Sequence, residues 1–306
     1  MEFVFDHLLR GPADAPAPTG VDGVWDRYRA VAGRFAGTVD DAAAAGFAAD
    51  RLGFAFLPGY QAALRALLPG LDPGALVSML ATEQGGGHPA AIATTLTETA
   101  DGWRVTGTKS FATLGDRADR FVVVASTGAG PDGRNRLRAA LVAADAPGVR
   151  VEPLPELPFA PEIPHASVRF DEVAAEPLPG DGYTDLLKPF RTVEDVHVLA
   201  ATLGYLIRVA RGAAWPDDTV ERLLALLAGV RGIEPAAYRS PGAHVALGGL
   251  FGALNTWVAD TEPLWARVDE AQRRRWERDR PLLGVAGKVR AQRLATAWRT
   301  VRPAGE

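Results

Sequence analysis

The spacing of apolar residues changes twice along this chain of 306 residues, and the double change limits the folds that it can adopt. Up to Leu71 apolar residues recur every three or four positions, which is the helical period. From Ile92 to Val173 they alternate as in strands, and after Gly182 the helical period returns. We therefore expect an α+β fold with a helical N-terminal domain (residues 1–81), a central antiparallel β-barrel or sandwich domain (82–182) and a C-terminal antiparallel helical bundle (183–306).

Helix signals divide the two helical stretches further. Asp72 and Pro73 have the side chains of a helix N-cap and first turn, so a last N-terminal helix is predicted from Asp72 to Ala81. Leu203-Gly204, inside one long predicted helix, would allow a second helix to approach closely. The other predicted helices cover residues 2–10, 25–35, 40–50, 60–68, 190–211, 218–230, 244–259 and 270–301.

The central stretch contains a hairpin and several further strands. Residues 94–97 and 103–106 are β-branched or alternating, and Asp101-Gly102 between them is a turn dipeptide. Further strands are predicted at residues 121–126, 138–143, 149–152 and 167–170. Residues 153–164 contain five prolines, and proline has no N–H to donate within a sheet, so no central strand is expected there. Short antiparallel strands at this spacing are typical of a small barrel or sandwich.

Composition excludes several classes of function. The net charge is −4, with 33 basic and 37 acidic residues, which argues against a nucleic-acid surface or an anionic-membrane surface. The chain has no cysteine, so disulfides and thiolate metal sites are impossible. No apolar signal core opens the sequence, and no apolar run approaches the roughly 18 residues of a membrane span. A cytoplasmic protein without a membrane span is expected.

The stretch from Thr82 to Gly115 carries the strongest functional signal. It begins Thr82-Glu83-Gln84-Gly85-Gly86-Gly87-His88. Three consecutive glycines favour a turn with exposed N–H groups, which attract anions and polarised carbonyls. Hydroxyls such as those of Thr82 and Thr113 can both donate and accept a hydrogen bond. An ordinary loop is the alternative interpretation.

The order of these motifs resembles that of the acyl-CoA dehydrogenase family. The family's β-domain opens on Thr-Glu-Pro-Gly-Ala-Gly-Ser, matched by Thr82, Glu83, Gly85 and Gly87. Its next motif, Gly-x-Lys-x-Trp-x-Thr-Asn-Gly, is matched by Gly107, Lys109, Thr113 and Gly115. Residues 118–125, 146–149 and 170–173 also match, so the resemblance extends over residues 82–173.

The resemblance implies a bound flavin, FAD, in the β-domain. Its implied cofactor-binding residues are Thr82, Gly85, Gly87, His88, Phe111 and Thr113. Thr82 and Thr113 would bond the edge of the isoalloxazine, and Phe111, where the family usually has Trp, would cover one face. His88 stands where the family has a serine near the flavin phosphates, and it would either bind phosphate or cap the following turn. Phe111 as plain core is the alternative.

Glu194 is the candidate catalytic base. One branch of the family has its base nine residues before a Leu-Gly pair, and counting back from Leu203 gives Glu194. A carboxylate in an apolar pocket has a raised pKa and can remove the α-proton of an acyl thioester. The implied reaction is α,β-dehydrogenation of an acyl chain on CoA or a carrier protein. A solvated helix face is the alternative for Glu194, and His197 would bond either Glu194, a substrate or a structural partner.

One departure from the family pattern keeps other functions open. No Arg-x-x-Phe-Gly segment follows the first bundle helix, and residues 215–240 stand in its place. In the family that segment brings an arginine to the FAD of a neighbouring subunit, so the resemblance implies a flavin site completed across a subunit interface. The bundle is also too short to enclose a cofactor alone. We therefore expect at least a homodimer or tetramer, or a hetero-oligomer with a full-length family member. The alternatives are a non-catalytic partner subunit without flavin, and a family fold reused as a flavin monooxygenase or for a non-redox reaction. The arginine-rich residues 273–280 are interpreted as a solvated helix face.

Overall fold

The computed structural model describes residues 2–233 and 235–302, which form two compact units. The helical unit contains the chain up to Ala66, residues 158–160 and the chain from Thr192 onward. The β-unit contains Leu67–Leu157 and Pro161–Arg191. The expected order of helical, β and helical segments is therefore present, but both helical segments belong to one unit. The boundaries of three separate domains stay a prediction.

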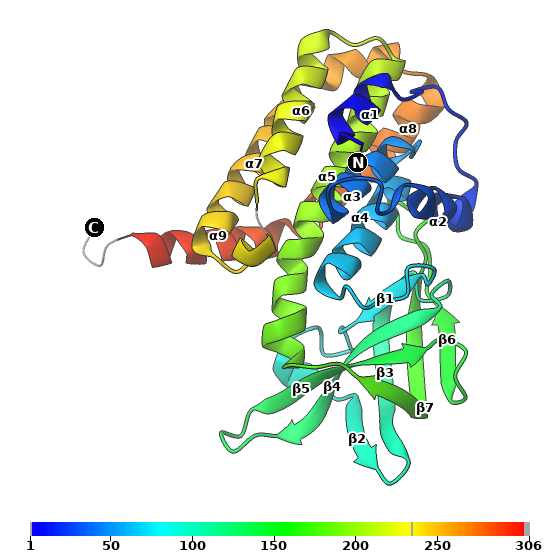
Figure 1. Cartoon of the computed structure of the whole chain (residues 1–306), viewed down its shortest axis with the longest axis vertical. Coiled ribbons are helices and arrows are strands. Elements are labelled where there is room, and N and C mark those ends of the chain that lie inside the picture. The colour runs from blue at the N-terminus through cyan, green and yellow to red at the C-terminus, as the bar shows by residue number, and fades with distance from the viewer. Residues whose placement is uncertain (1, 234, 303–306) are drawn as a thin grey trace. The chain divides into compact units, whose positions relative to one another are not determined.

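Nine α-helices are described, most of them wholly within the helical unit (Figure 1). They are α1 (Val4–Arg10), α2 (Gly20–Val31), α3 (Thr38–Phe47), α4 (Leu52–Leu67), α5 (Lys188–Gly212), α6 (Asp217–Arg231), α7 (Pro241–Thr261), α8 (Glu270–Asp279) and α9 (Gly287–Val301). Short helical turns lie at η3 (Pro235–Ala237), η4 (Glu262–Arg267) and η5 (Arg280–Gly284). The prediction of one helix over residues 270–301 is wrong, because Pro281 has no N–H to continue α8 and the chain turns through η5.

The helical unit is built around α5. Its residues Val196, Leu199 and Leu203 are buried, as the apolar stripe predicts. A Cβ on Gly204 would lie 2.0 Å from the carbonyl oxygen of Ala43, which is closer than any real Cβ contact. The backbones of α3 and α5 therefore touch, and the predicted close crossing at Leu203-Gly204 is confirmed.

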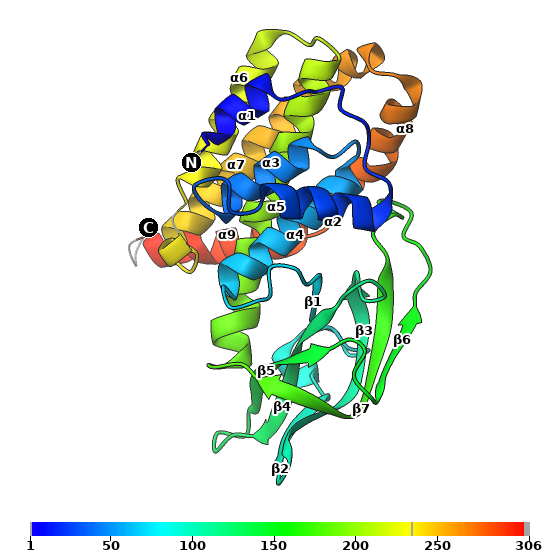
Figure 2. The same ribbon diagram turned by 45° about the vertical axis from the view of Figure 1, so that its right-hand side comes forward.

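Seven strands form the β-unit (Figure 2). They are β1 (Val77–Leu80), β2 (Thr95–Thr99), β3 (Gly102–Thr113), β4 (Arg120–Ala129), β5 (Asn135–Ala143), β6 (Val149–Pro153) and β7 (His165–Pro177), with helical turns η1 (Pro89–Ala91) and η2 (Gly182–Leu187). Pairing runs β4-β2-β3-β7-β5 and returns from β5 to β4, so the ring closes as a barrel. The predicted hairpin is confirmed as β2 and β3.

The barrel departs from the expected antiparallel pattern at two pairs. β1 pairs with β4 in parallel, and so does β2 through Thr95 and Ser126. The remaining pairs are antiparallel, and β6 adds to the ring through β7 (Figure 2). Alternate residues of the strands fill one core, including Leu96, Phe121 and Phe170.

The helix predicted from Asp72 to Ala81 is wrong. The Asp72 carboxylate accepts a hydrogen bond of 2.8 Å from the Gly74 N–H within a turn, and the chain then enters β1. All four residues of β1 are buried. A strand covered on both faces has a continuous apolar run instead of an alternating one, so its period cannot be distinguished from that of a buried helix.

Two kinds of site are not found in the described part of the chain. No helix within residues 2–233 and 235–302 is long and apolar enough to cross a membrane. The same residues contain no group of three His, Cys, Asp or Glu side chains arranged to hold a metal ion.

Candidate functional site

The glycine triplet forms a tight turn directly after β1. The Gly86 N–H donates to the Glu83 carbonyl at 2.8 Å, and the Glu83 N–H donates back to the Gly86 carbonyl at 3.2 Å. Gly86 has φ +95°, a conformation that favours glycine. A Cβ on Gly87 would lie 3.5 Å from Oγ1 of Thr82, so glycine leaves room in front of that hydroxyl. The turn thus uses two of its N–H groups internally and keeps the Thr82 side chain accessible.

A buried ion pair fixes this turn to β3. Nζ of Lys109, whose side chain is fully buried, lies 2.7 Å from Oε1 of Glu83. It also donates to the carbonyl oxygens of Val124 at 2.6 Å and Ala81 at 3.3 Å. All three donors of the ammonium group are therefore used. Both charged residues belong to the two sequence motifs, but their role as a pair was not predicted.

The Glu83 carboxylate is held by backbone donors as well. The N–H groups of Ala93 and Thr94 donate to it at 2.9 and 3.1 Å. Burial raises the pKa of Glu83, but the hydrogen bonds from Lys109 and from these two N–H groups outweigh burial and hold it below the usual value. Glu83 is therefore a charged structural anchor between the turn and the start of β2.

Phe111 is an exposed aromatic residue on β3. Its side chain is 42% exposed, and its ring centroid lies 4.3 Å from that of His165. Burial lowers the pKa of His165, against opposing effects of the Ile163 backbone and Asp116, which favours the neutral imidazole. Thr113 pairs with His165 in the ladder between β3 and β7. An uncharged ring thus supports Phe111, and the alternative that Phe111 is plain core does not hold.

Thr82 lies beside the same part of β3. The Ser110 N–H donates to the Thr82 carbonyl at 2.9 Å, which brings Thr82 next to the residue that precedes Phe111. Thr113 follows two positions after Phe111 and is partly exposed. The structure therefore brings the turn and the Phe111–Thr113 segment together, as the two motifs predict.

His88 caps the turn that follows the glycines. Its Nδ1 accepts a hydrogen bond of 3.3 Å from the Ala90 N–H at the start of η1. This is the capping alternative of the two that the sequence left open, and the ring is exposed. Nη2 of Arg191 lies 3.5 Å from the Gly87 carbonyl and adds a cation to the turn. Arg191 was not predicted, because it lies 104 residues away along the chain.

Glu194 and its neighbour Asp195 face different surroundings in the helical unit. Glu194 is partly exposed on α5. Asp195 is buried and pairs with two arginines of α9, with Oδ1 lying 3.0 Å from Nη1 of Arg290 and Oδ2 bonded to Arg293. Burial raises the pKa of Asp195, and the two guanidinium groups oppose that shift. Asp195 therefore anchors α9 to α5.

His197 is a structural residue. Its Nδ1 donates to the Val193 carbonyl at 2.7 Å, because a carbonyl can only accept. Its Nε2 therefore accepts from the Thr38 hydroxyl, at 2.8 Å. Both ring nitrogens are thus occupied without Glu194, which selects the structural alternative. Burial lowers the pKa of His197 to about 4, so the ring is neutral.

Comparison with known proteins identifies the β-unit. Residues 78–173 match the family model of the acyl-CoA dehydrogenase middle domain. The β-unit is thus similar to the middle domain of this family. The resemblance seen in the sequence is thereby confirmed, and all six candidate cofactor-binding residues fall within this middle domain. A comparison with curated protein sequences finds no match.

Solved structures share the fold at low sequence identity. PigA with FAD and proline is 14% identical with a TM-score of 0.71, and the match covers 98% of this chain and 99% of that one. Butyryl-CoA dehydrogenase from Megasphaera elsdenii is 14% identical with a TM-score of 0.68, covering 92% and 91%. FMN-bound TdsC from Paenibacillus sp. A11-2 is 18% identical with a TM-score of 0.68, covering 87% and 84%. These likenesses establish an acyl-CoA dehydrogenase-like fold with a central β-domain and helical regions.

Proposed function

We propose that this protein is a flavin-dependent enzyme that introduces an α,β double bond into an acyl thioester. The observation that carries the proposal is the exposed Phe111 ring, which lies with Thr82 and Thr113 on an acyl-CoA dehydrogenase middle domain. When a flat ligand stacks on an aromatic ring exposed on a rigid strand, apolar surface of the ring is removed from water, which favours binding. Two hydroxyls beside such a ring suit the polar edge of an isoalloxazine.

The residues around the glycine turn fit the flavin. Gly87 leaves space in front of the Thr82 hydroxyl, and Lys109 and Glu83 keep the turn rigid. Arg191 and His88 would meet the phosphates, since a guanidinium group suits phosphate geometry. We propose FAD as the cofactor, consistent with the FAD complex of PigA, although TdsC contains FMN.

Glu194 would act as the base. A bound flavin supplies the hydride acceptor for the β-carbon of the substrate. Glu194 would take the α-proton on a carboxylate oxygen and hold it as a neutral acid after the double bond has formed. Glu194 is partly exposed on α5, so its carboxylate is open to a bound ligand. Asp195 is unsuited to the task, because two arginines neutralise it.

The spectrum of the purified protein tests this function. We expect the absorbance bands of an oxidised flavin, and anaerobic addition of an acyl-CoA or of an acyl-carrier-protein thioester should bleach them. A colourless protein that takes up neither FAD nor FMN would contradict the proposal and support a non-catalytic partner subunit. A flavin that binds but reacts with no acyl thioester, while its reduced form reacts productively with oxygen and a substrate, would support a monooxygenase instead. Sedimentation of the flavin-bound protein tests the expected homodimer or tetramer.

A further inference from the structure

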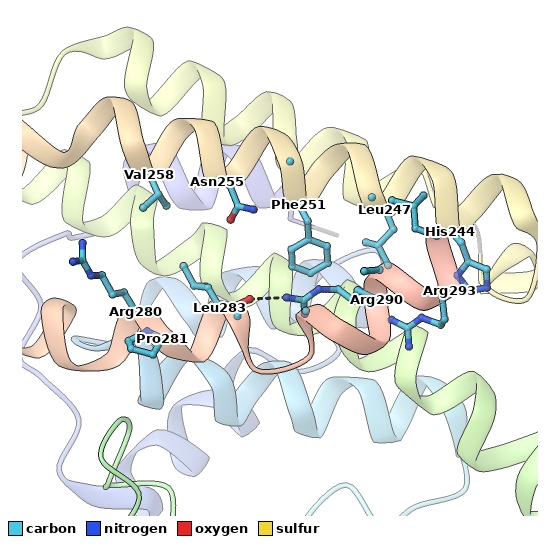
Figure 3. A pocket seen from close by; sticks show the side chains of 16 residues that line it. His244, Leu247, Phe251, Asn255, Val258, Arg280, Pro281, Leu283, Arg290 and Arg293 are labelled. Carbon is cyan, nitrogen blue, oxygen red and sulfur yellow. Dashed lines mark hydrogen bonds between the residues drawn. The ribbon is translucent and has the colours of Figure 1, made fainter. Parts of the chain in front are cut away.

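A groove of about 550 Å³ lies in the helical unit between α7 on one side and η5 with α9 on the other (Figure 3). None of the candidate flavin residues lines it, and Glu194 does not line it either. Its volume is within the roughly 300–1,000 Å³ of sites for small organic ligands. The groove is thus large enough for a ligand of its own.

The α7 wall of the groove is mostly apolar, with His244 and Asn255 as its polar residues. Leu247, Phe251 and Val258 point from α7 into it (Figure 3). Gly252 also lines it, and a Cβ on Gly252 would meet no atom within 4 Å, so the space beside this glycine is open. From Leu247 to Val258 the helix advances about 16 Å, at about 1.5 Å per residue. This wall therefore offers a long and mostly apolar surface to an extended chain, interrupted by Asn255.

The opposite wall is cationic. Arg280, Arg290 and Arg293 line it, and no Asp or Glu is among the described residues that line the groove. Arg290 is committed to Asp195 and to the Leu283 carbonyl at 2.6 Å, and its guanidinium carbon lies 4.0 Å from the Phe251 ring centroid. Arg290 and Arg293 share the single carboxylate of Asp195, so this group of three charges keeps one net positive charge. The groove consequently favours an anion.

Arg280 is the arginine that can exchange its partner most easily. Its Nη1 pairs with Glu262 at 3.2 Å, and both side chains are about half exposed. Exposed ion pairs contribute little to stability, so a ligand carboxylate can replace Glu262 at small cost. Arg280 lies at one end of the apolar wall, near Val258 (Figure 3). A polar head at Arg280 would leave the rest of the ligand to lie along α7.

We propose that this groove binds an extended aliphatic chain that ends in a carboxylate, as in a free fatty acid. The carboxylate pairs with Arg280, and the chain lies past Gly252 and Phe251 toward Leu247. The proposal does not depend on the flavin, because every lining residue belongs to the helical unit. Its test can therefore fail or succeed independently of the proposed dehydrogenase activity.

Calorimetric titration of the full chain with dodecanoate, below its micelle concentration, tests the charge requirement. We expect saturable binding with one site per chain. Dodecanol and dodecylammonium should bind about tenfold more weakly or not at all, which is the loss typical of a missing charge-assisted hydrogen bond. Equal binding of all three compounds would overturn the proposal, because it would indicate non-specific adsorption to apolar surface.

Two pairs of variants test the location. Gly252→Leu fills the open space beside α7 and should abolish dodecanoate binding, whereas Gly249→Leu, on the same helix with open space but outside the lining, should leave it unchanged. Both changes raise helix propensity, so loss of the fold is not expected. Arg280→Gln should weaken binding about tenfold. Its control is Arg222→Gln, which removes a similarly exposed pair with Asp260 outside the groove and should have no effect.

Two results would overturn the assignment. One is dodecanoate affinity that is equal in Gly252→Leu and in the parent chain. The other is that the parent chain binds no dodecanoate and sediments as an oligomer, and that Gly252→Leu dissociates this oligomer. That second outcome would identify the groove as an interface between copies of this chain.

Discussion

The buried pair between Lys109 and Glu83 should be the most sensitive charged contact of the β-unit. Lys109→Met keeps the length of the side chain but removes three hydrogen bonds, to Glu83, Val124 and Ala81. Removing one partner of a buried ion pair typically costs about 3–5 kcal/mol, because the other charge stays buried. Two backbone N–H groups still hold Glu83, which places the expected loss near the lower end, at about 3 kcal/mol.

Urea unfolding followed by circular dichroism measures this loss. With an m-value of about 2 kcal/mol/M, the midpoint should fall by about 1.5 M. Lys188→Met, at an exposed position, is the control and should change the free energy of unfolding by less than about 0.5 kcal/mol. The double variant Lys109→Met with Glu83→Gln should recover part of the loss, because no charge then stays buried. A single variant that loses less than about 1 kcal/mol, or a double variant no more stable than the single one, would refute this reasoning.

Three further predictions concern the helical unit and the flavin surface. Gly204→Ala should lower the free energy of unfolding by about 3 kcal/mol, measured by heat or urea, because its Cβ would lie 2.0 Å from the Ala43 carbonyl oxygen. Gly212→Ala is the control and should not destabilise the chain, because its Cβ would lie 3.8 Å from the nearest atom, the Ala13 carbonyl oxygen. Folding lowers the pKa of His197 from 6.5 to about 4. As pH falls, the imidazole is therefore protonated in the unfolded chain before it is protonated in the folded one. The free energy of unfolding should fall by about 3 kcal/mol between about pH 6.5 and about pH 4. A His197→Asn chain that loses as much stability over that range would contradict this assignment. Phe111→Ala should weaken flavin binding about tenfold in a fluorescence titration while changing stability by less than about 1 kcal/mol, and unchanged flavin affinity would remove Phe111 from the site.

The barrel strands were predictable where one face is buried and the other exposed. Leu96 and Val105 are buried between more exposed neighbours, so their alternation is visible in the sequence. β1 was missed because all its residues are buried, and its apolar run carries no alternation. The end of α8 was signalled by Pro281, but the helical period that continues beyond it concealed the break.

The candidate site was predictable only in its local parts. Thr82 and Phe111 lie in motifs whose spacing is fixed by one turn and one hairpin, so the sequence could bring them together. The partners of Asp195 could not be predicted, since Arg290 and Arg293 lie 95 and 98 residues away and any acidic residue could have met them. The contact of Arg191 with Gly87 could not be predicted for the same reason, since 104 residues separate them.

The central claim is that Glu194 removes the α-proton of an acyl thioester. Glu194→Gln keeps the size and hydrogen-bonding capacity of the side chain, but an amide cannot accept that proton. The variant should therefore fold and take up flavin like the parent. Glu221→Gln, at an exposed position on α6, is the matched control.

Stopped-flow bleaching of the flavin by the best acyl thioester is the most direct measurement. We predict that Glu194→Gln slows bleaching roughly 10²- to 10⁴-fold, the usual cost of losing a general base, while Glu221→Gln keeps the parent rate. A Glu194→Gln chain that binds flavin and bleaches at the parent rate would contradict the assignment of Glu194 as the base.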